Sequence, residues 1–484
     1  MKLKGLLAVG AICLMTAGWS APVNEVWTRI VALKDAGEFS QCSAYVNEVM
    51  ASSAYKNYPK PEQDRIVFQI DLLNRIKRDF RLDEQMMWDQ LTAVMPDLSK
   101  IEFEGLVNSR MLDWKLIDGQ KRFFSSSRAN LFIRYPDWAK RANKYNSEDG
   151  EILKWSYYLK ARDEHDKTGK SYVAPQKYKM TMTLTVKPDE APDGAVVKCW
   201  MPFPREVAHQ SDIKFLSSNV PLIKLSDGKA WQRTAYFERQ AVAGQTTEFQ
   251  MSYEFTAWGR YNPMSPDKVK PYKKDSEYSK WTQEKYPHVY FSPLVKEISP
   301  SIVGQETNPL KKAQLIYNWI AKNTKYSYAH EYSTMPNITD FVLTRRYGDC
   351  GQHGMTFITL CRYNGIPARW QSGWSLKPNQ ENLHDWAEYY VEPYGWIPCD
   401  PDAGVWIAHS QYLSEEQKDI LLNFYFQGVD HYRLTCNNDH GVDFDPVKKS
   451  HRSDDVDSQR GEIEVNGQNL YYPQWGYNML VERL

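Results

Sequence analysis

The sequence predicts an α+β protein built from several domains. Its 484 residues exceed what one hydrophobic core usually serves. Apolar residues recur at helical spacing from Val23 to about Pro96, whereas Tyr178 to Val186 and Phe249 to Phe255 alternate between apolar and polar residues, as strands do. From Asn308 onward a helical pattern comes first and strand-like segments follow. Helices and an antiparallel sheet that occupy separate stretches of the chain are typical of the α+β class.

The N-terminus has the features of a secretory signal peptide over residues 1–21. Two lysines lie within Met1-Lys2-Leu3-Lys4-Gly5, an apolar run follows from Leu6 to Ala17, and small residues come next. We expect cleavage near Ser20 or Ala21, and therefore a secreted or periplasmic protein. No other stretch is long and apolar enough to cross a bilayer, so no membrane span is expected.

Changes of pattern divide the rest of the chain into four regions. Residues 22–170 form a mainly helical region with a β-hairpin at Asp118-Gly119, and residues 175–260 form a β-sandwich-like domain. Residues 280–410 hold helices followed by strands and form an α+β core. Residues 411–484 are a C-terminal extension that ends in a hairpin around Asn466-Gly467.

Composition excludes some classes of partner. Lys and Arg together number 60, as do Asp and Glu, so a nucleic-acid or acidic-lipid partner is not indicated. The 17 Trp and 31 Tyr residues could line grooves for carbohydrate or peptide. We expect most of them to fill cores and sheet faces instead.

Three residues of the core follow one another as a cysteine nucleophile, its general base and the residue that orients the base. Cys350 lies in the turn Gly348-Asp349-Cys350-Gly351, which leads into a helical pattern. A helix N-terminus and a neighbouring imidazolium would lower the pKa of its thiol. His384 and Asp400 come later, each on a strand-like segment.

Asp400 is preferred as the orienting residue because it lies between an apolar strand end and Pro401. A hydrogen bond from one ring nitrogen of the histidine to this carboxylate would fix the imidazole tautomer. Asp385 and Asp402 are the alternatives.

The other cysteines predict neither a disulfide scaffold nor a zinc site, since their spacing is wide and irregular and no C-x-x-C pair occurs. Cys361 falls on the same helix as Cys350 at a distance of about 16 Å, too far for a disulfide.

Cys13 could carry a lipid, but Ile12 stands where a small residue would be wanted. An acidic set near the C-terminus fits no EF-hand and is interpreted as a solvated surface: Asp443, Asp445, Asp454, Asp455 and Asp457. Neither a metal nor an organic cofactor is expected.

Four ordered motifs together resemble the core of the transglutaminase-like superfamily over roughly residues 305 to 405. They are Tyr347-Gly348-Asp349-Cys350, Gly365-Ile366-Pro367-Ala368-Arg369, His384-Asp385-Trp386-Ala387-Glu388 and Gly395-Trp396-Ile397-Pro398-Cys399-Asp400-Pro401. The resemblance implies a papain-like fold with Cys350 as nucleophile, His384 as base and Asp400 as orienter. It also implies an aromatic or amide residue at the oxyanion hole.

Candidates for that oxyanion or substrate contact are Tyr328, Tyr326 and Trp386. His353, close after the nucleophile, departs from the family pattern and could crowd or tune the thiolate. The zinc-binding cysteine pairs of peptide N-glycanases are absent from the sequence.

The function that these residues predict is acyl transfer through a thioester, as in a peptidase-like amide hydrolase. The expected substrate is a peptide, a protein or a peptide–glycan conjugate. Two alternatives stay open: a protein-glutamine γ-glutamyltransferase that crosslinks proteins, and an inactive module that binds glycan or peptide. The segment from Ser375 to Asn382, just before His384, is the nearest candidate for a lid.

Overall fold

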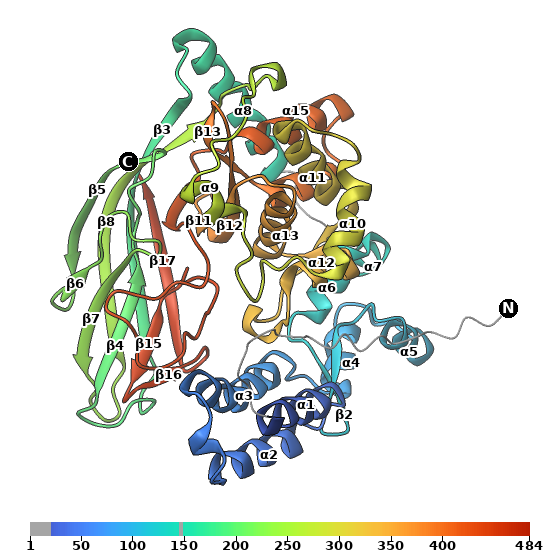
Figure 1. Cartoon of the computed structure of the whole chain (residues 1–484), viewed down its shortest axis with the longest axis vertical. Coiled ribbons are helices and arrows are strands. Elements are labelled where there is room, and N and C mark those ends of the chain that lie inside the picture. The colour runs from blue at the N-terminus through green and yellow to red at the C-terminus, as the bar shows by residue number, and fades with distance from the viewer. Residues whose placement is uncertain (1–20, 145–148) are drawn as a thin grey trace. The chain divides into compact units, whose positions relative to one another are not determined.

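The helices and strands of the computed structural model divide between two compact units (Figure 1). The first unit comprises residues up to 93 together with 97–127, and the second comprises residues 94–96 and 128–484. The structure describes residues 21–144 and 149–484, so the predicted signal peptide lies outside the described residues except for its last residue.

The first unit is a set of helices around one hairpin. Asp83 caps α4 by accepting a hydrogen bond from the backbone N–H of Met86. Asp118 and Gly119 have φ values of 48° and 78° and form the two-residue turn between β1 and β2, as predicted. The elements are α1 (Ala21–Asp35), α2 (Phe39–Ala51), η1 (Tyr55–Asn57), α3 (Lys60–Asp79), α4 (Glu84–Thr92), α5 (Lys100–Asn108), β1 (Trp114–Ile117) and β2 (Gln120–Phe123).

In the second unit, two antiparallel sheets share one hydrophobic core and form a β-sandwich. One sheet has the strand order β17-β3-β8-β5 and the other β16-β15-β4-β7-β6. The strands expected at 175–260 therefore share their sheets with three strands from beyond residue 460, of which β15 pairs with β4 and β17 pairs with β3. The bounds are β3 (Tyr172–Val186), β4 (Val196–Pro202), β5 (Gln210–Ser218), β6 (Lys224–Leu225), β7 (Thr234–Gln240), β8 (Thr247–Arg260), β15 (Glu462–Val465), β16 (Gln468–Leu470) and β17 (Trp475–Arg483).

A third sheet of the second unit, with strand order β13-β12-β11-β14, is antiparallel throughout and lies beside a group of helices (Figure 1). The strands are β11 (Ala368–Ser375), β12 (Asn382–Val391), β13 (Gly395–Cys399) and β14 (Arg433–Asn437), and a short parallel pair is formed by β9 (Lys325–Tyr326) and β10 (Tyr347–Gly348). The remaining elements are α6 (Ser127–Arg134), α7 (Pro136–Arg141), α8 (Asp149–Thr168), η2 (Pro266–Lys268), α9 (Ser276–Thr282), α10 (Pro293–Val303), α11 (Pro309–Asn323), η3 (Tyr332–Thr334), α12 (Ile338–Arg345), α13 (Cys350–Tyr363), α14 (Pro401–Ala408) and α15 (Glu415–Gln427).

Helix α13 is the centre of this part of the fold. Its residues from Gly351 to Arg362 are all buried, and its apolar side chains join a core to which α11, α14, α15, β12 and β13 also contribute. A helix that is buried on all sides is held by packing, and its first residue is fixed with it. The predicted α+β class, with a papain-like arrangement of helix and sheet, is confirmed.

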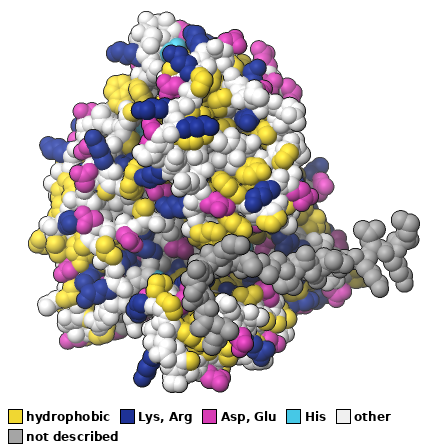
Figure 2. Space-filling view, in the orientation of Figure 1, with side chains coloured by type: hydrophobic (Ala, Val, Ile, Leu, Met, Phe, Trp, Pro, Cys, Tyr) yellow, Lys and Arg dark blue, Asp and Glu magenta, His cyan; other side chains and the backbone are white. Residues whose placement is uncertain are grey.

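The surface carries charges of both signs. On the face shown in Figure 2, Lys and Arg side chains alternate with Asp and Glu side chains, in keeping with a formal net charge of zero. Within the described residues, no helix is both long and apolar enough to span a membrane.

Candidate active site

Cys350 is the first residue of α13, and its surroundings explain why the chain turns there. Asp349 and Gln352 form a reciprocal capping box at the helix start. Gly348 and Gly351 both lie where a side chain would not fit, since a Cβ atom at Gly351 would meet the Tyr332 hydroxyl at 2.2 Å. The thiol therefore lies at a helix N-terminus, as the sequence predicts, and side chains pack closely against the two flanking glycines.

His384 and Asp400 come together from two neighbouring elements of the sheet. His384 lies near the start of β12, and Asp400 follows β13 and caps α14 by accepting a hydrogen bond from the backbone N–H of Ala403. The distance from His384 Nε2 to Asp400 Oδ2 is 2.8 Å. In the neutral imidazole, donation from Nε2 leaves Nδ1 as the ring nitrogen that can accept a proton.

Arg433 completes this pair and was not identified from the sequence. Its Nη2 donates to Asp400 Oδ2 at 2.7 Å, and both side chains are almost fully buried. Burial pushes the pKa of Asp400 upward, but the charges of His384 and Arg433 and the hydrogen bonds outweigh it. The pKa of Asp400 is therefore held well below its ordinary value, and the carboxylate stays ionised.

The thiol of Cys350 differs from the expectation in the direction of its pKa. Its Sγ lies 3.6 Å from Asp385 Oδ2. Burial, and then the carboxylates of Asp385, Asp349 and Asp402, raise the pKa of the Cys350 thiol well above its ordinary value. In this arrangement burial and the neighbouring carboxylates disfavour the thiolate, although the thiol lies at a helix start.

Asp385 belongs to a buried acidic group, which the sequence did not predict. It is 3% exposed, as is Asp457. Burial and the neighbouring carboxylates Asp457, Asp349 and Asp454 raise the pKa of Asp385 well above its ordinary value. The interpretation of the C-terminal acidic set as a solvated surface is therefore wrong for Asp457, which packs beside the site.

The aromatic candidates lie in different environments. Tyr326 packs against Trp406 and Tyr328, with ring centroids 5.0 and 5.7 Å away, and burial, followed by the nearby acidic groups, raises its pKa well above its ordinary value. Tyr328 is 45% exposed. Trp386 is buried and stacks on His384, with ring centroids 5.8 Å apart.

Tyr332 is a further aromatic residue at the site that sequence reasoning missed. Its hydroxyl donates to Asp349 Oδ1 at 2.6 Å, and it lies against Gly351. Burial raises the pKa of Asp349 to about 6. Tyr332 comes from a short 3₁₀ turn, for which the sequence offers no periodic signal.

His353 does not crowd the thiolate. Its Nδ1 lies 3.0 Å from Asp402 Oδ1, and its Nε2 lies 3.2 Å from Thr324 Oγ1. Both ring nitrogens are engaged within the core, and Asp402 is occupied by this histidine. Of the two alternatives to Asp400, Asp402 thus pairs with His353 and Asp385 contacts Cys350.

The predicted lid segment is the connection between β11 and β12. Arg483 of β17 donates to the Leu376 carbonyl oxygen at 2.8 Å and to the Glu381 carboxylate at 2.6 Å. The connection is thereby tied to the β-sandwich in this structure.

The described cysteines Cys42, Cys199, Cys350, Cys361, Cys399 and Cys436 are all free. In the described part of the chain, no group of three or more His, Cys, Asp or Glu side chains is arranged to hold a metal ion.

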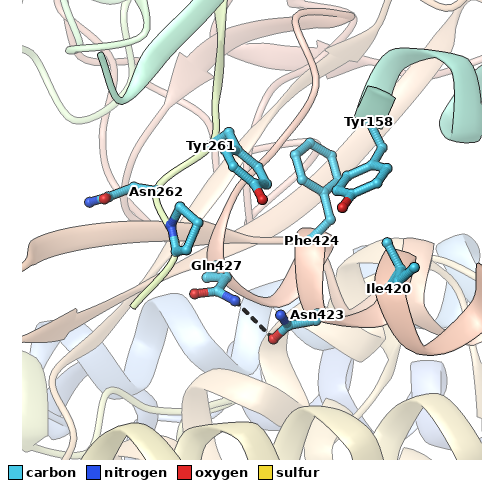
Figure 3. Close-up of a pocket in the computed structure, with 8 residues that line it drawn as sticks. Tyr158, Tyr261, Asn262, Ile420, Asn423, Phe424 and Gln427 are labelled. Carbon is cyan, nitrogen blue, oxygen red and sulfur yellow. Dashed lines mark hydrogen bonds between the residues drawn. The ribbon is translucent and has the colours of Figure 1, made fainter. Parts of the chain in front are cut away.

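A separate cavity of about 100 Å³ lies among α8, α15 and the segment after β8 (Figure 3). Its aromatic wall is formed by Tyr158, Tyr261 and Phe424, and Gln427 donates to Asn423 at its edge. The lining residues include none of those around Cys350.

Comparison with known proteins finds a family match over the part of the chain that holds Cys350, His384 and Asp400. Residues 296–401 match the Transglutaminase-like superfamily. The chain carries a transglutaminase-like domain. This match supports the interpretation of the chain as a cysteine-dependent enzyme. The domain contains Cys350, His384 and Asp400, whereas Arg433 and Asp457 lie beyond it.

Two curated relatives are themselves uncharacterised. The chain is 30% identical over 175 residues to a protein of Haemophilus influenzae, a match that covers 30% of this chain and 47% of the relative. It is 24% identical over 144 residues to YebA of Bacillus subtilis, covering 26% of this chain and 19% of the relative. The chain thus matches less than half of the length of either relative.

Similar solved structures include a candidate cysteine protease from Cytophaga hutchinsonii, with 16% identity, a TM-score of 0.44 and coverage of 65% of this chain and 92% of that chain. The periplasmic domain of TgpA from Pseudomonas aeruginosa has 14% identity and a TM-score of 0.26, with coverage of 55% of this chain and 95% of that chain.

Proposed function

We propose that the protein is a cysteine-dependent amide hydrolase of peptidase-like type, with Cys350 as nucleophile, His384 as general base and Asp400 as the orienting carboxylate. The observation that carries the proposal is the 2.8 Å hydrogen bond between His384 Nε2 and Asp400 Oδ2. Arg433 keeps this carboxylate ionised, and a histidine oriented in this way has Nδ1 available for a thiol proton.

The reaction starts when the Cys350 thiol turns from Asp385 to His384 and gives its proton to Nδ1. The sulfur then forms a bond to the carbonyl carbon of an amide, and the carbonyl π electrons move to oxygen. The oxyanion is stabilised by backbone N–H groups of the first turn of α13, with Tyr326 as a side-chain candidate. His384 returns the proton to the leaving amine as the C–N bond breaks, and a thioester remains.

Water resolves the thioester in this proposal. His384 takes a proton from the water, the hydroxyl adds to the acyl carbon, and the thiolate leaves and is reprotonated. Resolution by an amine would make the protein a crosslinking transferase. We favour water because the described site has no feature that marks a dedicated amine site. The proposed substrate is a peptide, a protein or a peptide–glycan conjugate.

The experiment compares two products of one assay. A glutamine-containing peptide and a peptide library are incubated with the protein and a labelled primary amine. Release of free acid or new peptide ends is expected to exceed amine incorporation. Cys350→Ala is expected to abolish turnover with an unchanged circular dichroism spectrum, because the thiol acts in the reaction path and contributes little core volume.

Two other results would redirect the proposal. Incorporation that dominates at millimolar amine would favour the transferase. Binding of glycan or peptide without turnover, equal in the wild-type protein and Cys350→Ala, would favour the inactive binding module.

We also propose a secreted or periplasmic location, which is supported by the signal-like sequence of residues 1–21. The test is N-terminal sequencing of the protein from a cell fraction, with a new N-terminus expected near Ser20 or Ala21.

A further inference from the structure

Residues 438–460, which we call the strap, connect β14 to β15 and lie outside the transglutaminase-like match. Two buried glutamates of β15 hold the strap. Glu462 accepts hydrogen bonds from Lys448 Nζ at 2.6 Å and from the Ser453 backbone N–H at 2.8 Å. Glu464 accepts from the backbone N–H and the hydroxyl of Ser450, at 2.9 and 2.8 Å. The strap is therefore an ordered part of the second unit.

Gln459 lies at the end of the strap and connects it to the sheet. Its Nε2 donates to the His384 carbonyl oxygen at 2.9 Å, to the Gly373 carbonyl oxygen at 3.2 Å and to Asp385 Oδ1 at 2.8 Å. Gly373 and His384 are partners in the register of β11 and β12. In addition, Trp374 Nε1 donates to the Gln459 carbonyl oxygen at 2.7 Å. Gln459 thus links both strands at the position of the proposed base.

The carboxylate of Asp385 connects Gln459 to the nucleophile. Its Oδ1 accepts from Gln459, and its Oδ2 lies 3.6 Å from Cys350 Sγ. On the helix side, a Cβ atom at Gly351 would meet the same Oδ2 at 2.7 Å. Asp385 is therefore held between the strap and the first turn of α13.

We propose that Gln459 is a positioning residue of the active site, which holds the strand of His384 and the carboxylate of Asp385 in place beside Cys350. The strap is then part of the catalytic apparatus although it lies beyond the family match. The predicted effect on turnover rests on the proposed function. The predicted effect on the pKa of the Cys350 thiol does not, because it follows from the contacts of Gln459 and Asp385.

Loss of the Gln459 amide should change the pH midpoint of Cys350 alkylation in a predictable direction. A carboxylate that loses a hydrogen-bond donor binds its proton more tightly. Asp385 then carries a negative charge less often, and a neutral neighbour repels the Cys350 thiolate less. The substitution leaves in place the other titratable groups that act on Cys350 or Asp385, which are Asp349, Asp402, Asp454, Asp457, Tyr326 and Tyr332, and it also leaves His384, the proposed base. The pH midpoint of Cys350 alkylation should fall.

The experiment measures alkylation of Cys350 by iodoacetamide against pH, followed by peptide mass spectrometry. The other described cysteines are buried, so the modified peptide identifies the site. In Gln459→Met, the midpoint is expected to fall by about half a pH unit or more. Turnover is expected to fall at least about tenfold, because the base strand loses its link to the strap.

A double-mutant cycle and a control separate positioning from a general loss of stability. Asp385→Asn should lower the midpoint in the same direction, and the double variant with Gln459→Met should show little further shift. Gln210→Met is the matched control, since Gln210 is also buried and its amide donates to the Arg205 and Thr435 carbonyl oxygens and not to Asp385. Its midpoint should equal that of the wild type. If Gln459→Met does not fold, Gln459→Asn should show a smaller shift of the same sign.

An unchanged midpoint in folded Gln459→Met, or an equal shift in Gln210→Met, would overturn the inference. The alkylation assay needs no substrate. Failure of the proposed function would instead appear as wild-type protein that is alkylated at Cys350 but turns over no amide.

Discussion

Asp400 is the residue on which the ionic part of the site depends. Two positively charged or protonatable groups, His384 and Arg433, meet at the same oxygen, Oδ2. Arg433 also lies 3.5 Å from Asp430, so it is shared between two buried carboxylates. Removal of one member of such a network leaves an uncompensated buried charge, and its cost exceeds the net contribution of the intact pair.

Arg433→Met is expected to destabilise the protein by about 3 kcal/mol at pH 7, because Asp400 and Asp430 lose their buried partner. The folded-state pKa of Asp400 is depressed, so its stabilising effect is fully present above its unfolded value of about 3.9 and is lost as the pH falls below that value. The difference between wild type and variant should therefore shrink toward pH 3.

Urea unfolding at pH 7 and at pH 3 to 4 measures this difference. Arg345→Met, which changes an exposed arginine of α12, is the control and should shift stability by less than about 0.5 kcal/mol. A difference between wild type and Arg433→Met that grows on acidification would show that the ion pair with Asp400 is not the source of the effect.

His384→Ala is expected to lower kcat/KM by about 10³-fold or more, and Asp400→Asn by less, since the carboxylate orients the base and does not replace it. Initial rates of peptide hydrolysis measure both. His409→Ala, at a histidine that contacts the Thr324 carbonyl oxygen, is the control for loss of an imidazole. Wild-type kinetics in Asp400→Asn would remove this residue from the proposed triad.

Individual residues of the site differed in how far the sequence predicted them. The motifs around Cys350, His384 and Asp400 each carry a turn or strand signal, and the structure brings the histidine and the aspartate together. Arg433, Tyr332 and Gln459 carry none, because each comes from a separate segment and reaches the site only through tertiary packing. The lowered pKa that the sequence predicted for the Cys350 thiol is wrong, because the sequence did not reveal the burial of the thiol or its acidic neighbours, which include Asp385 on β12 and Asp402 on α14.

At the scale of elements, helix starts were the most predictable feature. The helical pattern expected from Asn308 onward is α11, which Asn308 caps by accepting from the backbone N–H groups of Leu310 and Lys311, and Pro309 follows at the first helical position. Cys350 begins α13, and Gly365 follows its end with a φ of 74°. These signals are local in sequence. The strap has no such signal, since it is held by side chains of β15.

Glu462→Gln is expected to loosen the strap. The ammonium and guanidinium groups of Lys448 and Arg452 outweigh burial and lower the pKa of Glu462 to about 2. Relative to an unfolded value of about 4.3, this shift corresponds to roughly 3 kcal/mol, present above that pH and lost as the pH falls through 2. The variant should lose about this much stability at pH 7 and show a weaker dependence on acid.

Chemical unfolding at pH 7 and pH 3 tests this, together with limited proteolysis, in which new cleavage sites should fall within residues 438–460. Glu482→Gln is the control, because its partner Lys179 forms a surface pair of little energetic effect. Equal stability of Glu462→Gln and wild type at pH 7 would mean that the strap is held by other contacts.

At the scale of the whole molecule, strands from the C-terminal end of the chain pair with strands that come much earlier in the sequence. Strand β17 pairs with β3 from Trp475↔Val186 to Arg483↔Tyr178, and β15 pairs with β4. Alternation predicted that strands exist at 175–260 but could not reveal these partners, because register between distant segments depends on tertiary packing. As a result, the strap is anchored at one end by β14 of the core sheet and at the other by β15 of the β-sandwich.

A shortened chain of residues 128–484 is expected to keep the active site. The hydrogen bonds described for Cys350, His384, Asp400, Asp385 and Gln459 all join residues of the second unit. The first unit has a hydrophobic core of its own, formed by residues from Val23 to Phe124. The pH midpoint of Cys350 alkylation should therefore match that of the full chain, and the shortened chain should unfold cooperatively. Thermal unfolding and iodoacetamide labelling of both chains measure this. A shifted pH midpoint of Cys350 alkylation in a shortened chain that still unfolds cooperatively would show that the first unit contributes to the environment of the thiol.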